Sequence, residues 1–211
     1  ITLLATSSNP TVEVYPEYIE LTTECIGVFE IITPESVDLT DFVQIAMVVP
    51  MVDSDTALII GAILENLRQS HKDKVLLRIT TPGGSIENKW AVVDTILFYR
   101  RQGMTIYTLA EGYSFSAGFD ILLAGERRFI GQYTHILTHS GYMVNKNGKA
   151  TKKDVEETQL DVATRENPKS MAYAMKMTNN NEELRLILLT PGDHFMSPRD
   201  AIRMGIVEGV L

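Results

Sequence analysis

Apolar segments that alternate with amphipathic helices constrain the fold of this chain more than any other feature of its sequence. The segment FVQIAMVVP predicts a strand that ends at Pro50, and KVLLRITTPGG, which is apolar almost throughout, predicts a strand buried on both faces. Between them, VDSDTALIIGAILENLRQ has apolar residues spaced by three and four, which predicts a helix capped by Ser54 or Asp55. Such alternation produces βαβ crossovers, so we expect an α/β fold with a mostly parallel sheet.

The alternation continues along the rest of the chain. SIENKWAVVDTILFYRRQG predicts a second helix with a serine cap, and MTIYTLAEG predicts a third strand. The later expected elements are a helix from about Ser116 to Ala124, strands in RRFIG and THILTHSG, a long helix from Lys152 to about Met177, and a helix near Glu182 to Leu189. The first 40 residues have no sustained period. We therefore expect an N-terminal arm over residues 1–40 and a single domain over residues 41–211.

Composition and charge exclude several classes of function. The 211-residue chain has a net charge of -8 and no run of five Lys or Arg residues, so we expect no nucleic-acid partner. No apolar run is long enough to span a bilayer, so we expect no membrane partner and a cytoplasmic protein, with an organellar or viral source left open. The single Cys25 and the four histidines lack the paired spacings of a zinc site, so no metal is expected.

Two turns carry the residues with chemical potential. TTPGGS and AEGYSFSAG each follow an expected strand and open a helix, and parallel sheets bind ligands at the carboxyl ends of their strands. Ser116, at the start of a helix, is the candidate nucleophile. The candidate bases are His139 and His135, of which only His139 ends its strand. Asp193, after a Pro-Gly break, and Asp120, one helical turn from the serine, are rival candidates to orient the base. Taken singly, a serine, histidine or aspartate at such positions is more often structural than catalytic.

Four motifs, in the order in which they occur, resemble those of the ClpP family of self-compartmentalising serine peptidases. TTPGGSI resembles the family's Asn-Ser-Pro-Gly-Gly turn, and GYSFSAGFDILLAG resembles its Gly-x-Ala-x-Ser-Met-Gly segment. RFIGQYTHILTHSG resembles the strand that ends in His-Gln-Pro, and PGDHFMSPRDAIRMGIVEGVL resembles the Asp-x-aromatic-Met-Ser ending. The resemblance covers about residues 42–211 and implies a ClpP/crotonase-like fold.

The resemblance assigns roles to individual positions. It implies that Ser116 is the nucleophile, His139 the general base and Asp193 the orienting acid, with the amides of Gly84 and Ala117 in the oxyanion hole. It also implies two segments that flank an extended substrate, formed by Gly84, Ser85 and Ile86 and by Gly141, Tyr142 and Met143. Asp120 stands where the family usually has an apolar residue, so we expect it to affect His139 or the specificity pocket.

The resemblance also implies a biological assembly. It would be an ATP-independent endopeptidase core without cofactor or metal, cleaving unfolded polypeptides that an AAA+ unfoldase delivers. Residues 151–177 would form the handle helix through which two heptameric rings meet in a tetradecamer. Two alternatives remain open from the sequence: a catalytically silent ring subunit, and a crotonase-like acyl-CoA enzyme.

Overall fold

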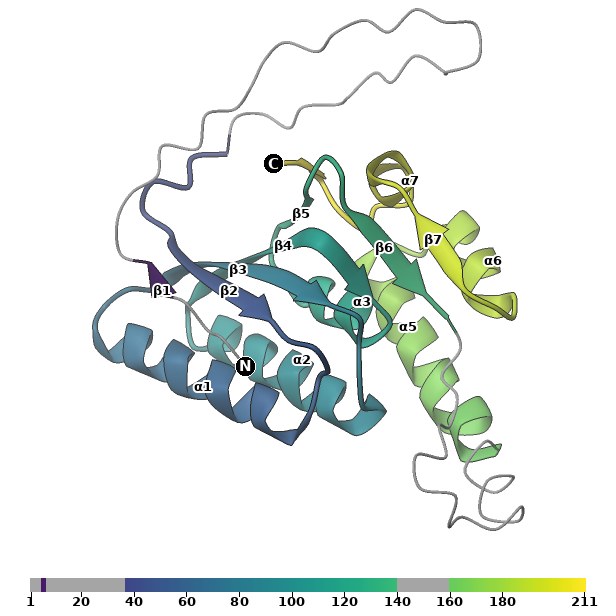
Figure 1. Cartoon of the computed structure of the whole chain (residues 1–211), viewed down its shortest axis with the longest axis horizontal. Helices are drawn as coiled ribbons and strands as arrows, with labels where there is room; N and C mark the ends of the chain where they lie inside the picture. Colours follow the sequence, from purple (N-terminus) through teal and green to yellow (C-terminus); the bar gives the residue numbers. More distant parts are fainter. Residues whose placement is uncertain (1–4, 7–36, 140–159) are drawn as a thin grey trace, which may run out of the picture.

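The computed structural model describes residues 5–6, 37–139 and 160–211, and its centre is one eight-stranded sheet (Figure 1). The strands are β1 (Ala5–Thr6), β2 (Val43–Val48), β3 (Lys74–Thr81), β4 (Thr105–Phe115), β5 (Arg128–Ile130), β6 (His135–Thr138), β7 (His194–Met196) and β8 (Gly209–Val210). They lie in the order β1-β2-β3-β4-β5-β8, while β6 pairs with β4 and β7 pairs with β6. Only the pairings of β1 with β2 and of β6 with β7 are antiparallel. The expected α/β fold with a mostly parallel sheet is confirmed.

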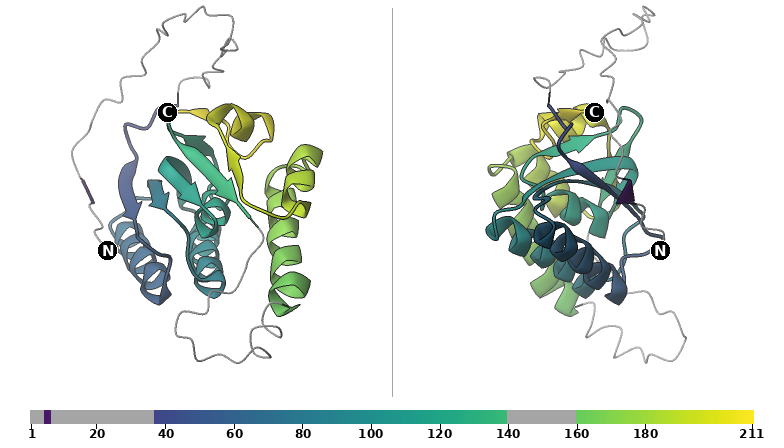
Figure 2. Two further views of the ribbon diagram at one scale, coloured as in Figure 1. Left: turned by 45° about the vertical axis from the view of Figure 1, so that its right-hand side comes forward. Right: turned by 90° about the vertical axis from the view of Figure 1, so that its left-hand side faces the viewer.

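Helices cover the sheet and connect its parallel strands. They are α1 (Ser54–Gln69), α2 (Ile86–Arg101), α3 (Ala117–Leu122), the π-helix η1 (Val162–Glu166), α5 (Asn167–Met177), α6 (Glu182–Leu189) and α7 (Pro198–Arg203). Helices α1 and α2 lie side by side below the sheet in Figure 1, and the left view of Figure 2 shows α5 at the opposite side of the domain from α1. Among the described residues, no helix combines the length and apolar character needed to cross a membrane.

The start of α1 differs from the expectation. Its N-cap is Asp53, whereas the sequence pattern favoured Ser54 or Asp55. The Asp53 carboxylate accepts hydrogen bonds from the amides of Asp55 and Thr56, and the Thr56 hydroxyl accepts one from the Asp53 amide. This reciprocal capping box satisfies more free amides than a serine one residue later would. The expected Ser85 cap of α2 is confirmed.

Strand β4 runs further than MTIYTLAEG predicts, because it changes its partner along its length. Thr108–Ala110 pair with β5, and Tyr113–Phe115 pair with β6. Between these parts lies Gly112, whose φ of 71° lies in the left-handed region that glycine adopts without strain. As a result, the segment that the sequence suggests is a turn is still strand, and Ser116 follows it directly.

The core lies on both faces of the sheet. The larger cluster, which includes Val75, Leu77 and Ile79 of β3, packs under the helices. A smaller cluster of Leu39, Leu76, Leu109 and Phe129 covers part of the opposite face. Since successive residues of β3 enter different clusters, the prediction of a strand buried on both faces is confirmed.

Several expectations fall on residues outside the described ranges. These are Cys25, most of the N-terminal arm, the flanking residues Gly141, Tyr142 and Met143, and the first part of the helix expected from Lys152. The described part of that helix is helical as expected, but it contains a π-helical turn, Val162–Glu166, that apolar spacing does not reveal.

Candidate active site

The candidate site forms at the carboxyl ends of the parallel strands β3, β4 and β6. Gly83 and Gly84 follow β3, Ser116 follows β4, and His139 follows β6. Strand β7 runs antiparallel to β6, so its first residue lies at this same end of the sheet, and Asp193 immediately precedes it. The topology therefore brings together four segments that are far apart in the chain.

Ser116 occupies a strained turn between β4 and α3. Its φ of 53° and ψ of -111° are outside the regions that non-glycine residues commonly adopt. Such a conformation costs about 1–3 kcal/mol and persists only where the surroundings impose it. The Ser116 amide donates a 2.8 Å hydrogen bond to the Leu137 carbonyl of β6, two residues before His139. Ser116 is the N-cap of α3, but its side chain makes no capping hydrogen bond, so capping does not occupy the hydroxyl.

The Pro-Gly-Gly turn packs directly against this serine. A Cβ atom added to Gly83, whose φ is 107°, would lie 2.7 Å from the Ser116 Cβ and 2.9 Å from the Phe115 carbonyl oxygen. On its other side the turn is held by Val52, whose amide donates to the Gly83 carbonyl at 2.8 Å and whose carbonyl accepts from Ser85 at 3.0 Å. Only glycine fits at this contact, and the close approach fixes the turn relative to the nucleophile.

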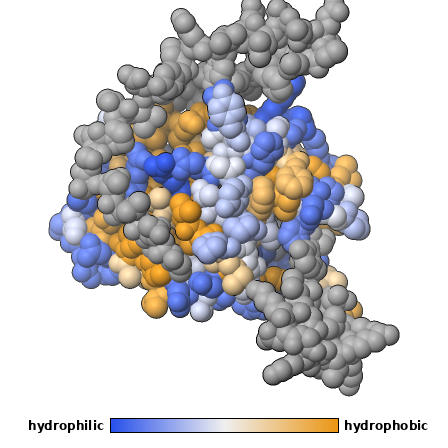
Figure 3. Space-filling model, in the orientation of Figure 1, coloured by the Kyte–Doolittle hydropathy of each residue, from blue (hydrophilic) through white to orange (hydrophobic). Residues whose placement is uncertain are grey.

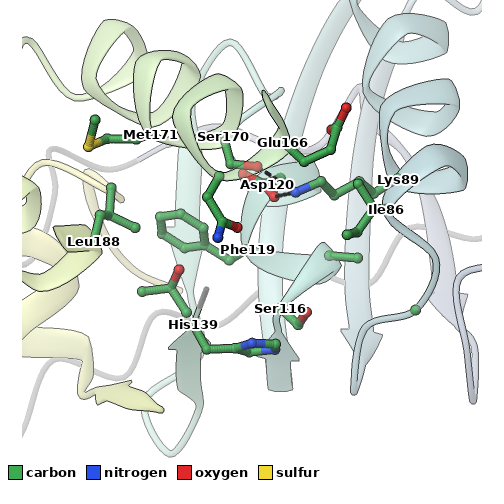
Figure 4. Close-up of a pocket in the computed structure, with 14 residues that line it drawn as sticks. Ile86, Lys89, Ser116, Phe119, Asp120, His139, Glu166, Ser170, Met171 and Leu188 are labelled. Atoms are coloured by element: carbon green, nitrogen blue, oxygen red, sulfur yellow. Dashed lines mark hydrogen bonds and ion pairs between the residues drawn. The ribbon is translucent and has the colours of Figure 1, made fainter. Parts of the chain in front are cut away.

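Ser116 and His139 line the same pocket, which has a volume of about 50 Å³ (Figure 4). In this view the His139 ring extends toward Ser116. Gly84 and Ala117 also line the pocket, at the positions expected to supply oxyanion amides, and residues of α2, η1, α5 and α6 complete its walls. His135, at the start of β6, is exposed and does not line this pocket. Of the two candidate bases, the structure therefore brings only His139 to the candidate nucleophile.

Asp193 lies near His139 by strand register but does not line the pocket. Thr138 pairs with His194, so extending the register by one residue sets His139 opposite Asp193. Residues opposite each other in an antiparallel pair have Cβ atoms about 4.5–5.5 Å apart, which is within reach of a carboxylate. Asp193 is exposed to solvent in the single chain. Its role as the orienting acid remains a prediction that the register favours.

Asp120, the rival orienting acid, is buried in the pocket wall. Its carboxylate forms an ion pair with Lys89 of α2, and the Lys89 ammonium also donates to the Ser170 hydroxyl at 2.7 Å. Burial raises the pKa of Asp120, while the nearby charge of Lys89, its hydrogen bond and the nearby charge of His139 lower it. Asp120 thus lies in the pocket wall, and its expected effect on His139 or the specificity pocket remains a prediction that this position favours.

Lys89 is the residue at this site that the sequence interpretation missed. It lies on the buried face of α2, three and four residues before the buried Val92 and Val93. A cation at an apolar position of a helix indicates a buried acidic partner, since a lone buried charge is very costly. That signal was present in the spacing, but the partner is 31 residues away and spacing alone does not identify it.

The fold and the edge site together define a ClpP-like protein. A serine at a strand-to-helix turn, a histidine at the end of the neighbouring parallel strand and a glycine turn beside the serine lie together, and they come from three of the four motifs. The family model described as Clp protease matches residues 36–211. The chain belongs to the Clp protease family. Its members are in general serine peptidases that form rings and work with unfoldases, so this chain is a ClpP-like peptidase or a relative of one.

Proposed function

We propose that this chain is the serine endopeptidase subunit of a compartmentalised protease that cleaves unfolded polypeptides. The observation that carries the proposal is the strained Ser116 turn, which lines one pocket with His139 at the carboxyl edge of the sheet. A strained conformation at a buried turn needs a compensating reason, and presenting a nucleophile is a common one. A serine that only fills space in the core would not require a strained backbone conformation.

In the proposed reaction His139 removes the hydroxyl proton of Ser116 as the serine oxygen attacks the substrate carbonyl carbon. The imidazolium then donates this proton to the leaving amine, and an ester to Ser116 remains. A water molecule, deprotonated by His139, hydrolyses the ester and regenerates the serine. Asp193 holds the imidazole in position and stabilises its charged form.

The oxyanion of the tetrahedral intermediate is held by the backbone amides of Gly84 and Ala117. Ala117 is the first residue of α3, so its amide belongs to the unpaired group at a helix start. Gly84 lies in the turn that packs against Ser116, and both residues line the pocket. Oxyanion donors of this kind are each worth about 10²–10³-fold in rate.

The proposal includes assembly into heptameric rings, with two rings meeting through residues 151–177, and delivery of substrate by an AAA+ unfoldase. A groove of about 620 Å³ between α1 and α2 supports the ring, because it is bordered by Leu58 and Phe98, which are 72% and 48% exposed. Side chains of this size are seldom left in water together unless another surface covers them. Figure 3 shows further apolar surface on the side of the domain where β6 and β7 lie.

The test is labelling by a fluorophosphonate, which reacts with activated serines, read by intact mass spectrometry. We expect one label per wild-type chain and none on Ser116→Ala, together with a fall in peptide cleavage of about 10⁶-fold in that variant. Native mass spectrometry of the same samples reports whether rings are present. An assembled ring that takes no label would indicate a silent subunit and would contradict the peptidase proposal.

A further inference from the structure

The pocket beside Ser116 has a polar far wall, which distinguishes it from an ordinary apolar specificity pocket. Apolar side chains of Phe119, Met171 and Leu188 line part of it. Beyond them, Figure 4 shows a cluster of polar side chains from α2, α3, η1 and α5. A substrate side chain that enters the pocket beside Ser116 ends against this polar cluster. The chemistry of the cluster therefore decides which substrate side chain the pocket accepts.

The Lys89 ammonium in this cluster already has partners. The Lys89 ammonium donates to Asp120 Oδ2 and to the Ser170 hydroxyl, and it lies 4.8 Å from the centre of the Trp90 ring. The Lys89 and Asp120 side chains are only 10% and 6% exposed. An ammonium group has three N–H donors. Two of those of Lys89 form the hydrogen bonds to Asp120 and Ser170, and the ammonium also contacts the face of the Trp90 ring.

The acceptor groups are not all used. Asp120 is only 4% exposed, and its buried Oδ1 has no hydrogen-bond partner among the residues that the structure describes. Glu166 adds a second carboxylate to the pocket lining, and its Oε2 accepts from Trp90 Nε1 at 2.9 Å. The residue comes from the π-helical turn η1, a feature often found at functional sites. A second cation is also present, since the Lys169 ammonium lies 4.3 Å from the centre of the same Trp90 ring. The unmet group of the wall is therefore the Asp120 Oδ1 acceptor, which a charged donor from a substrate would satisfy.

We propose that this pocket binds the cationic side chain, lysine or arginine, of the substrate residue whose carbonyl carbon Ser116 attacks. The apolar residues match the aliphatic stem of such a side chain, and Asp120 and Glu166 match its charged end. The volume of about 50 Å³ holds roughly three to five water molecules, which suits the end of an extended side chain better than a large aromatic ring. This inference rests on the proposed peptidase function and names its substrate preference.

The test uses peptides that differ only at the residue before the cleaved bond. For the wild-type full-length protein we expect kcat/KM for lysine or arginine to exceed that for leucine or glutamate by about 10–100-fold, the range for hydrogen bonds to charged groups. Asp120→Asn keeps the shape but removes the charge, so the ratio of kcat/KM for lysine to kcat/KM for leucine should fall to about one. Ser170→Ala is the matched control, because it leaves both charges in place and should keep the preference.

Two further measurements keep the outcome decisive. Asp120→Asn leaves Lys89 without a counter-charge, and such an unpaired buried charge can impair the folding of this single variant. The double variant Lys89→Met with Asp120→Leu removes both charges of the ion pair. It should convert the preference to leucine. Binding of the same peptides to Ser116→Ala, read by fluorescence anisotropy, reports the pocket without catalysis. Wild-type preference for leucine or glutamate, or a cationic preference that survives in Asp120→Asn, overturns the inference. Selective lysine binding without fluorophosphonate labelling would instead refute the peptidase proposal and retain this pocket.

Discussion

The two halves of the candidate site are held in different ways. The nucleophile half, where β4 meets α3, is enclosed: Ala117 and Phe119 are each 2% exposed, and Gly83 packs directly against Ser116. The base half, where β6 pairs with β7, lies at the margin of the sheet. Strand β7 has three residues, Phe195 is 62% exposed, and Asp193 is exposed as well.

This difference indicates that the base half is held less firmly by packing within the domain than the nucleophile half. The conformation of Ser116 is held by the close packing of Gly83 and by the hydrogen bond from its amide to the Leu137 carbonyl. The position of Asp193 relative to His139 depends on one short antiparallel pairing. An exposed, short edge pairing has few contacts to resist local opening. We therefore expect perturbations of the nucleophile half to act on the chemistry of Ser116, and perturbations of the base half to act through the alignment of His139.

Apart from loss of the nucleophile itself, the largest expected effect comes from the orienting acid. Asp193→Asn should lower kcat by about 10⁴-fold, because the amide no longer stabilises the imidazolium and favours the wrong tautomer. Asp120→Asn should lower kcat on the same peptide far less than Asp193→Asn, because the Asp120 carboxylate is bound by Lys89 and does not hold the imidazole. Steady-state kinetics on a peptide with leucine before the cleaved bond measure both.

The same pair of variants decides between the two acids. Fluorophosphonate labelling rates provide a second readout, since they report activation of Ser116 without substrate binding. If Asp120→Asn is the variant that loses turnover and Asp193→Asn is not, then the buried acid orients the base and the register argument for Asp193 is wrong.

A smaller effect is expected from the glycine turn in the nucleophile half. Gly83→Ala should lower kcat/KM by about 10²–10³-fold, because the new Cβ would lie 2.7 Å from the Ser116 Cβ and displace the nucleophile. Gly103 is the matched control: its φ of 93° is similarly restrictive, but nothing lies within 4 Å of an added Cβ. Each alanine should cost about 1–2 kcal/mol of stability for its backbone conformation, and only Gly83→Ala should lose activity. Equal activity losses in the two variants would show that backbone strain, and not contact with Ser116, is responsible.

The two halves were also unequally predictable from the sequence. Ser116 and His139 were placed correctly at strand ends because apolar periodicity identifies buried strands and parallel strands share a carboxyl edge. The length of β4 was not predicted, because its extension past Gly112 depends on a change of partner from β5 to β6 that no local pattern encodes. Strand β7, too short to show an alternating pattern, was likewise missed.

Interactions between distant segments account for the remaining differences. Asp120 stood out in the sequence as an acid among apolar residues, but its pairing with Lys89 joins α3 to α2 and is set by helix packing. The cap of α1 was displaced by one residue because Thr56 returns a hydrogen bond to the Asp53 amide. A choice among adjacent capping residues depends on such side-chain geometry, so sequence patterns locate helix ends only approximately.

The smallest expected effect tests the weak edge directly. The Phe195 ring of β7 meets the Phe115 ring edge to face, with centroids 5.7 Å apart, and this contact joins the two halves of the site. Phe195→Ala should lower the free energy of unfolding by about 0.5–1.5 kcal/mol, the value of such an aromatic pair, since little of the side chain is buried. Phe119→Ala, which removes a buried side chain from α3, should cost about 3–5 kcal/mol. Urea unfolding measures both, with Tyr133→Ala as a control at an 86% exposed site.

Because Phe195 lies close to Asp193 in the base half, its removal should also slow turnover severalfold without changing the fluorophosphonate stoichiometry. A loss of stability as large as that of Phe119→Ala would show that the β6–β7 edge is as firmly built as the nucleophile half, and the contrast between them would fail.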